Sequence, residues 1–156
     1  PDMVADWYKT NGYHFLALSD HNLMQVGERW IKAPKDTVAK SPLGTYQNRF
    51  APGWVETRQA GTNLEVRLKT LGEIRSIFEE KGRFLMIPAS EITSGYKVWP
   101  VHVNGTNLRY PIAATAGTNV LDTMRLSVDA VLFQRRTTGQ PGAVAAYQRS
   151  PATVNR

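Results

Sequence analysis

The fold of this chain follows from one stretch of sequence, Phe15-Leu16-Ala17-Leu18-Ser19-Asp20-His21-Asn22. Its first four residues are apolar and typical of a short buried strand, and polar residues follow without a spacer. In α/β barrels, active-site side chains emerge at the carboxyl ends of such strands. We therefore predict that His21 is a metal ligand and that Asp20 is a nearby catalytic hydrogen-bond or proton-transfer partner. On this dipeptide alone, a polar strand end that caps the next turn is an open alternative.

The composition limits the kind of metal site that this chain can form. Its 156 residues include no cysteine and only three histidines, His14, His21 and His102. Disulfides and thiolate metal sites are therefore excluded. A metal would have to be held by His, Asp and Glu, which suits Zn, Mn or Fe.

The charge of the chain bears on its partners. A formal net charge of +6 permits a phosphorylated or nucleic-acid partner. The basic residues are spread along the sequence, however, and the only tight cluster is Arg135-Arg136. A solvated basic surface explains this distribution as well as a binding patch does, so a nucleic-acid partner is possible but not indicated.

The sequence leaves the cellular compartment open. No run of residues is long and apolar enough to cross a membrane, so we expect no membrane partner. No signal peptide is visible. The chain begins at Pro1, and Met3 falls inside an expected helix, so we expect that the chain has been cut at its amino end. Such a chain fits a cytoplasmic and an exported soluble protein equally.

Apolar periodicity predicts an alternation of helices and strands. The expected elements, in chain order, are a helix over 1–11, a strand over 15–18, a short helix near 23–30, a hairpin over 54–69, a helix over 70–81 that begins with the capping box Thr70–Glu73, strands over 84–88 and 98–103, a helix over 119–138, and the start of a strand at 142–146. Such alternation favours a parallel α/β sheet or barrel, into which the hairpin is inserted.

Two helices carry predicted buried stripes of apolar residues at helical spacing. The first consists of Met3, Val4, Trp7 and Tyr8, and the second of Val120, Leu121, Met124, Val128, Val131 and Leu132. We expect each stripe to face the core of the domain.

Two further residues join His21 in a candidate site. Glu91 follows the apolar strand 84–88, and His102 lies within the strand 98–103. A parallel barrel would bring all three to one rim, and two imidazoles with a carboxylate are a common metal-binding set. Taken singly, His102 also fits a core histidine and Glu91 a cap for the turn at Thr93-Ser94. We expect His14 to be structural.

Three segments resemble motifs of the PHP family, named for polymerase and histidinol phosphatase. Leu18-Ser19-Asp20-His21-Asn22 resembles the family's Thr/Ser-Asp-His motif. Ile87-Pro88-Ala89-Ser90-Glu91-Ile92 resembles Ile-Pro-Gly-x-Glu-Ile, with Ala89 in place of the usual glycine. Val101-His102-Val103-Asn104-Gly105 resembles the family's His-hydrophobic-hydrophobic-Gly strand. The motifs occur in the family's order, and the resemblance extends over residues 1 to about 141, apart from the hairpin.

The resemblance implies a fold and a reaction. The fold would be a distorted (β/α)7 TIM-like barrel, incomplete in this chain, with up to three divalent metals at its carboxyl rim. The reaction would be hydrolysis of a phosphate ester by metal-activated water. His21, Glu91 and His102 would be metal ligands, with Glu91 bridging two metals and Asp20 supporting the site. The substrate would be a phosphorylated small molecule or a nucleotide, and the sequence does not identify it.

This sequence lacks several motifs of the family, which changes the expected activity. The family opens with a His-x-His strand and closes with a further His motif and a late Asp-x-His, and this sequence contains none of them. We therefore expect one partial PHP-like domain over 1–156, an internal fragment of a phosphoesterase that lacks ligands and is inactive by itself. The alternative is a non-catalytic, degenerate PHP-like module that serves binding or scaffolding.

The last residues, 142–156, depart most from the family pattern. A metal-site strand should follow Gln140-Pro141, but the chain continues as Gly142-Ala143-Val144-Ala145-Ala146 without a histidine. We hypothesise that the residues after about Pro141 come from a shifted reading frame. Such a tail should lack a buried stripe and be irregular.

Overall fold

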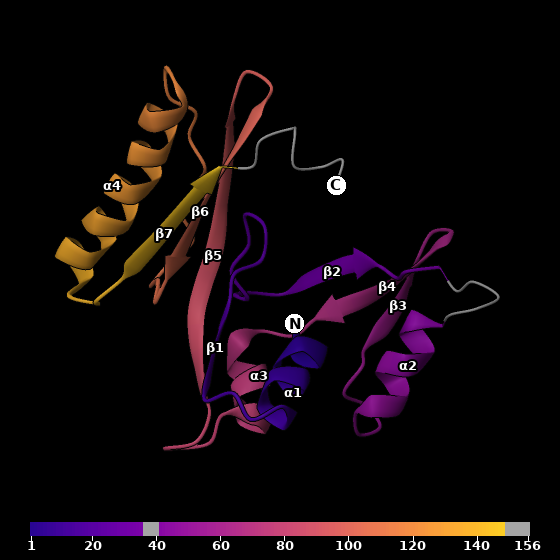
Figure 1. Cartoon of the computed structure of the whole chain (residues 1–156). Coiled ribbons are helices and arrows are strands. Elements are labelled where there is room, and N and C mark those ends of the chain that lie inside the picture. Colours follow the sequence, from indigo (N-terminus) through magenta and orange to yellow (C-terminus); the bar gives the residue numbers. More distant parts are fainter. Residues whose placement is uncertain (36–40, 149–156) are drawn as a thin grey trace. The chain divides into compact units, whose positions relative to one another are not determined.

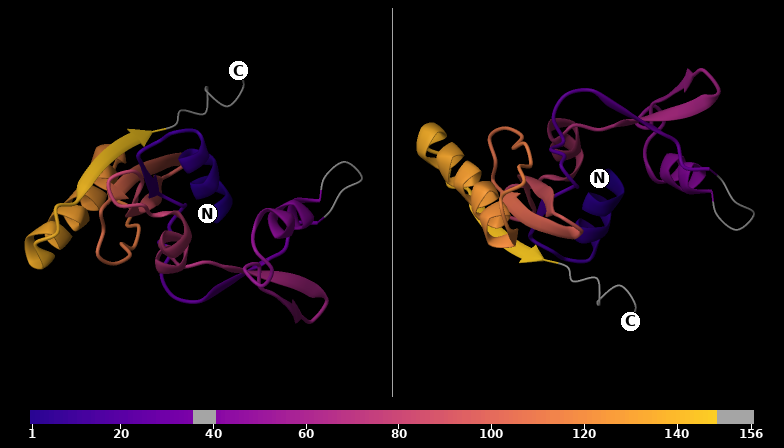
Figure 2. Two further views of the ribbon diagram at one scale, coloured as in Figure 1. Left: turned by 90° about the horizontal axis from the view of Figure 1, so that it is seen from below. Right: turned by 90° about the horizontal axis from the view of Figure 1, so that it is seen from above.

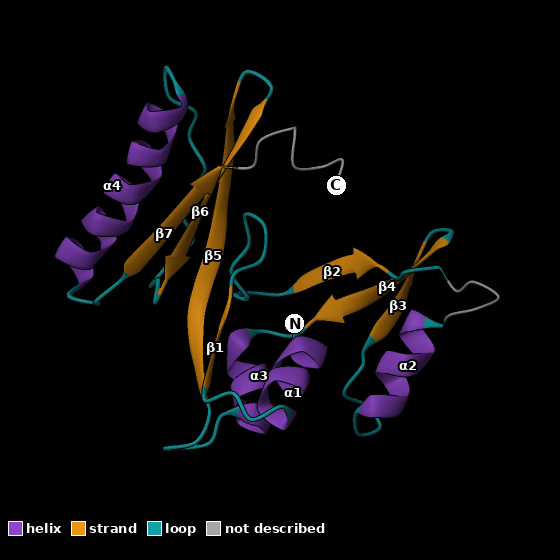
Figure 3. Ribbon diagram, viewed as in Figure 1, coloured by secondary structure: helices purple, strands orange, loops and turns teal. Residues whose placement is uncertain are grey.

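The computed structural model describes residues 1–35 and 41–148, the last four of them by their backbone alone. Over these residues the chain is a mixed α/β protein with four helices and two sheets, and the sheets do not close into a barrel (Figures 1 and 3). It divides into two compact units. Unit 1 combines Pro1–Gly12 with Gln25–Glu79, and unit 2 combines Tyr13–Met24 with the chain from Glu80 onward.

Unit 1 contains three helices and an antiparallel sheet in the order β2-β4-β3. Its elements are α1 (Asp2–Thr10), β2 (Arg29–Lys32), α2 (Pro42–Arg49), β3 (Thr57–Ala60), β4 (Asn63–Leu68) and α3 (Leu71–Phe78). The predicted hairpin is confirmed as β3 and β4. The short helix expected near 23–30 is wrong, because Arg29–Lys32 instead pairs with the second edge of β4.

Local capping signals predicted α3 well, whereas the burial of α1 differs from the prediction. The capping box between Thr70 and Glu73 is present, and α3 ends at Phe78 instead of continuing to residue 81. In α1 the residues Met3, Val4 and Trp7 of the predicted apolar stripe are exposed, and the buried residues are Asp2 and Ala5. The inward face of α1 is set by polar bonds, since the Asp2 carboxylate accepts hydrogen bonds from the Trp54 indole and the Tyr46 hydroxyl.

Charged residues link the hairpin of unit 1 to α3. The Lys69 ammonium group is buried, lies 2.6 Å from the Glu56 carboxylate and faces the Trp54 ring at 4.6 Å. Arg67 bonds both Glu56 and Glu73, the latter in the first turn of α3. Hydrogen bonds from Arg67 and Lys69 lower the pKa of Glu56 to about 2. Each buried or half-buried cation therefore has an anionic partner.

Unit 2 is a four-stranded sheet with one long helix. Its elements are β1 (Phe15–Leu18), β5 (Leu85–Tyr96), β6 (Trp99–Thr106), α4 (Val120–Thr138) and β7 (Ala143–Gln148), with the strands in the order β1-β5-β6-β7 (Figure 1). β1 and β5 are parallel, and the other two pairs are antiparallel. The expectation of an all-parallel sheet is therefore wrong.

The antiparallel pairing follows from the length of β5 and the turn that ends it. The strand expected at 84–88 continues to Tyr96, and the turn that follows it lies at Lys97 and Val98. Lys97 has a φ of 54°, as tight two-residue hairpin turns require at their first central position. The chain therefore folds straight back, and β6 pairs with β5 from Trp99 to Thr106.

α4 covers one face of the four-stranded sheet (Figures 1 and 2). The core between them consists of Met24, Ile92, Val103, Leu108 and Val131, with Ile112, Met124 and Val128 packed against it. The predicted stripe on α4 is correct for Val131, whereas Leu121 is exposed. No helix in residues 1–35 and 41–148 is long and apolar enough to cross a membrane.

Buried polar residues on α4 hold the loop that precedes it. The Gln134 side chain accepts a hydrogen bond from the Arg109 amide and donates one to the Tyr110 carbonyl. The Thr123 hydroxyl accepts one from the Gly117 amide. These bonds explain why polar positions of the helix are buried.

The segment after Pro141 forms a regular strand as far as it is described. Ala143–Gln148 pairs with β6 over its whole length, so the strand expected at 142–146 is confirmed. The expectation of an irregular tail is wrong for these residues, because their backbone pairs with β6. The rest of the tail, 149–156, lies outside the described residues, and the reading-frame hypothesis stays a prediction.

Adding a methyl group at Gly105 should loosen the contact between the sheet and α4. A Cβ atom there would lie 3.1 Å and 3.2 Å from the Leu108 methyl groups and 3.3 Å from Val131 Cγ2, and both neighbours are buried. Gly105→Ala should lower the free energy of unfolding by about 1–3 kcal/mol. Gly72→Ala is the matched control, since the nearest atom to its Cβ is 4.0 Å away and it lies in helix α3. It should raise stability by roughly 0.5–1 kcal/mol.

Urea unfolding followed by circular dichroism measures both variants. Equal effects of the two substitutions would contradict the packing described for Gly105.

Candidate metal centre

The structure brings His21, Glu91 and His102 together on unit 2. Each offers one ligand atom, and the three atoms lie within 4.8 Å of one another. His21 follows β1, Glu91 lies in the middle of β5, and His102 lies in β6. The three side chains therefore converge as predicted, although one parallel and one antiparallel strand pair assemble them in place of a parallel barrel rim.

Backbone pairing holds His21 beside Glu91. The Glu91 amide donates to the Asp20 carbonyl at 3.0 Å, and the Asn22 amide donates to the Glu91 carbonyl at 2.7 Å. His21 and Glu91 are therefore bridge partners in the parallel pair. Paired residues of neighbouring strands project to the same face of a sheet. The position of the His21 side chain thus depends on the backbone of Glu91.

Asn22 continues the sheet with its side chain and was not among the predicted site residues. Its amide group donates to the Thr93 carbonyl at 2.9 Å, and its side-chain oxygen accepts from the Thr93 amide at 2.7 Å. The Asn22 backbone has a φ of 52°, a left-handed conformation that asparagine tolerates better than most residues. The chain can therefore turn away directly after His21 while the end of β1 stays attached to β5.

Thr93 contacts the His102 ring from the opposite position on β5. The two residues are register partners, and the Thr93 hydroxyl lies 3.0 Å from His102 Nδ1. Glu91 Oε1 lies 3.4 Å from the same nitrogen. Metal-binding histidines commonly bond one ring nitrogen to a protein group and present the other to the metal. If His102 donates its Nδ1 proton to the Thr93 hydroxyl, its lone pair lies on Nε2, and Nε2 is then the ligand.

The structure bears differently on the single-residue alternatives for Glu91 and His102. Glu91 lies inside a strand and so does not cap a turn. Val101 and Val103, on either side of His102, are buried, whereas the His102 side chain is on the other face of β6 and 12% exposed. His102 therefore lies on the face opposite the core against α4, and its role stays a prediction. His14 is exposed, and its carbonyl accepts a hydrogen bond from the Leu85 amide.

Asp20 contributes its backbone to the site. Its carbonyl oxygen accepts hydrogen bonds from the amides of Glu91, at 3.0 Å, and Leu23, at 3.2 Å. Its carboxylate is not one of the three groups that converge among the described residues. Adjacent residues of an extended chain point to opposite faces, which separates the Asp20 side chain from that of His21. The catalytic role of Asp20 stays a prediction.

The three side chains suit a divalent transition metal. Imidazole nitrogen and carboxylate oxygen bind Zn, Mn and Fe well, and the described residues include no thiolate. Three protein ligands leave a coordination position for water, as in catalytic zinc sites. His21 is exposed, so a ligand can reach the group from solvent. The donor set therefore fits a catalytic metal better than a closed structural one.

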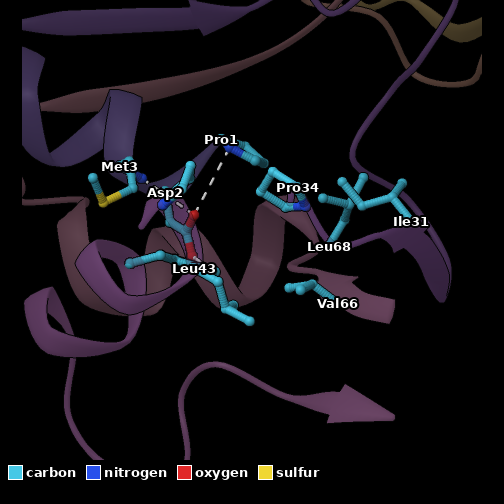
Figure 4. A pocket seen from close by; sticks show the side chains of 10 residues that line it. Pro1, Asp2, Met3, Ile31, Pro34, Leu43, Val66 and Leu68 are labelled. Carbon is cyan, nitrogen blue, oxygen red and sulfur yellow. Dashed lines mark hydrogen bonds and ion pairs between the residues drawn. The ribbon is translucent and has the colours of Figure 1, made fainter. Parts of the chain in front are cut away.

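A second candidate, an apolar pocket in unit 1, offers less chemistry (Figure 4). It has a volume of about 170 Å³ and is lined by Pro1, Asp2, Met3, Ile31, Pro34, Pro42, Leu43, Tyr46, Val66 and Leu68. The buried Asp2 carboxylate is already bonded by Tyr46 and Trp54, and burial together with this bond raises the pKa of Tyr46. The polar groups of this pocket therefore form hydrogen bonds with other residues of unit 1.

Comparison of the chain with profiles of protein families, with curated proteins and with solved structures finds no match. The resemblance to the PHP family thus rests on the three sequence motifs, and family membership stays a prediction.

Removing the Thr93 hydroxyl should weaken metal binding through His102. Thr93→Val keeps the branched shape but frees the His102 ring, and loss of such a supporting bond typically costs 10–100-fold in metal affinity, so we expect a drop of about 10-fold. Thr106→Val is the control, because the Thr106 hydroxyl donates to the Ala143 carbonyl and not to a histidine. Titration calorimetry with Mn²⁺ or Zn²⁺ measures both. Unchanged or tighter binding by Thr93→Val would show that Nδ1 itself is the ligand.

Proposed function

We propose that this chain carries a metal centre of the PHP type, which hydrolyses phosphate esters with metal-activated water. One observation supports the proposal most. Each of the three segments that resemble PHP motifs supplies one of the converging residues His21, Glu91 and His102. The three segments thus meet at one point, as the proposal requires.

We also propose that the sheet of unit 2 is part of a distorted (β/α)7 barrel. The parallel pair of β1 and β5, with His21 directly after the carboxyl end of β1, supports this proposal. Barrel enzymes place their catalytic groups at that end of the strands. The antiparallel strands β6 and β7 are a departure from the barrel pattern.

In the proposed mechanism the side chains have separate tasks. A bound metal would lower the pKa of water and neutralise charge on the phosphoryl oxygens. His21, Glu91 and His102 would hold it, and the second carboxylate oxygen of Glu91 allows a bridge to another metal. Thr93 fixes the His102 ring, and we propose Asp20 as a proton-transfer partner. The positive net charge of the chain would favour a phosphorylated small molecule or a nucleotide as substrate.

Replacing the three histidines one at a time tests this site. Thermal unfolding of the wild-type chain should shift to higher temperature with millimolar Mn²⁺ or Zn²⁺, because a ligand that binds only the folded state stabilises it. His21→Ala and His102→Ala should lose most of this shift. His14→Ala should keep it, because His14 is exposed and lies outside the converging group. A full shift in His21→Ala and His102→Ala would contradict the proposed centre.

Binding of inorganic phosphate then distinguishes a hydrolytic metal centre from a metal-binding scaffold. Phosphate should bind to the wild-type chain only when metal is present, since the open metal position would receive it. Metal binding without phosphate binding would favour the non-catalytic module. Hydrolysis of a chromogenic phosphodiester by this chain should be slow at most, because the family pattern includes more histidines than this sequence contains.

A further inference from the structure

An oxygen atom without a partner lies on the strand that carries His102. The side-chain oxygen of Asn104 is buried and has no hydrogen-bond partner among the described residues. Buried polar atoms in folded proteins nearly always have a partner. A buried acceptor of this kind therefore points to a donor that the described residues do not supply.

The strand register places Asn104 on the face of the metal centre. Asn104 is directly opposite Glu91 in the β5–β6 pair and comes two residues after His102. Residues that are opposite each other, or two apart along a strand, project to the same face of a sheet. Glu91 in turn is the bridge partner of His21. His21, Glu91 and Asn104 thus form a row across three adjacent strands.

The other face of the same strands is apolar. Val103, next to Asn104, belongs to the core against α4, together with Ile92 of β5. A Cβ atom on Gly105 would meet Leu108 and Val131 of this core. Asn104 therefore does not serve the packing between the sheet and α4.

Among the residues whose side chains the structure describes, none donates a hydrogen bond to the Asn104 oxygen. The Glu91 carboxyl group lies 3.4 Å from His102 Nδ1. The Thr93 hydroxyl contacts the His102 ring, and the Asn22 amide donates to the Thr93 carbonyl.

We propose that Asn104 belongs to the metal centre and accepts a hydrogen bond from a water molecule in the open position of the metal. This inference rests on the proposed function, and neither the motifs nor the charged residues identify Asn104. Asn104 would be a positioning residue, which would orient this water through one hydrogen bond to the Asn104 oxygen. The uncharged amide does this without adding negative charge that would repel a phosphate.

Two substitutions at Asn104 test this role. Asn104→Leu has a similar size but no polar atom, so the metal-free chain should unfold at the same or a higher temperature while affinity for Mn²⁺ falls about 10-fold, as for other supporting groups of metal sites. Asn104→Asp places a carboxylate in the row with Glu91 and should bind Mn²⁺ at least about 10-fold more tightly. Asn63→Leu and Asn63→Asp, on β4 of unit 1, are the matched controls and should leave Mn²⁺ affinity unchanged.

Titration calorimetry with Mn²⁺ measures the affinities, and the visible spectrum of bound Co²⁺ reports the water position. Both Asn104 variants should change the Co²⁺ spectrum, and the controls should not. Wild-type affinity and spectrum in both Asn104 variants, alongside metal binding that still requires His21, would overturn the role of Asn104 alone. No metal binding by the wild-type chain would overturn the proposed function and this inference together.

Discussion

The double pairing of β5 at Glu91 is the constraint on which the candidate site depends. The backbone of this residue bonds Asp20 and Asn22 on one side, while the residue faces Asn104 across β6 on the other. Glu91 thus takes part in parallel pairing with the segment after β1 and in antiparallel pairing with β6. This arrangement places His21 and Asn104 on either side of the Glu91 carboxylate. A shift of either pairing by one residue would turn the side chains to opposite faces and disperse the site.

The two faces of the four-stranded sheet have different tasks. One face packs Ile92 and Val103 against α4 and makes the strands rigid. The other carries Glu91, His102 and the hydrogen bonds that orient them. Because residues alternate between the faces along each strand, His102 lies between the buried Val101 and Val103, and Glu91 precedes the buried Ile92. Packing on the first face therefore holds the polar groups on the second face at fixed distances.

Local signals in the sequence predicted many of the helices and strands. They did not predict which strands pair with each other or in which direction. The strand at 15–18, the capping box before α3 and the helix at 119–138 depend on nearby residues and are correct. The antiparallel course of β6 was missed, because Pro100 disfavours a central strand and Ser94-Gly95 resembles a turn. In the structure Gly95 and Pro100 are register partners near the hairpin end, where a missing amide costs little.

The three converging side chains could be predicted from their residue types, because histidine and glutamate are recognisable metal ligands. Asn22, Thr93 and Asn104 could not, since uncharged polar residues in strands carry no distinctive signal and their roles follow from the register. The central claim is that His21, Glu91 and His102 share a metal. Anomalous X-ray diffraction from crystals grown with Mn²⁺ tests it most directly. We predict an anomalous peak bounded by these three side chains, and a peak elsewhere only, or none at saturating Mn²⁺, would contradict it.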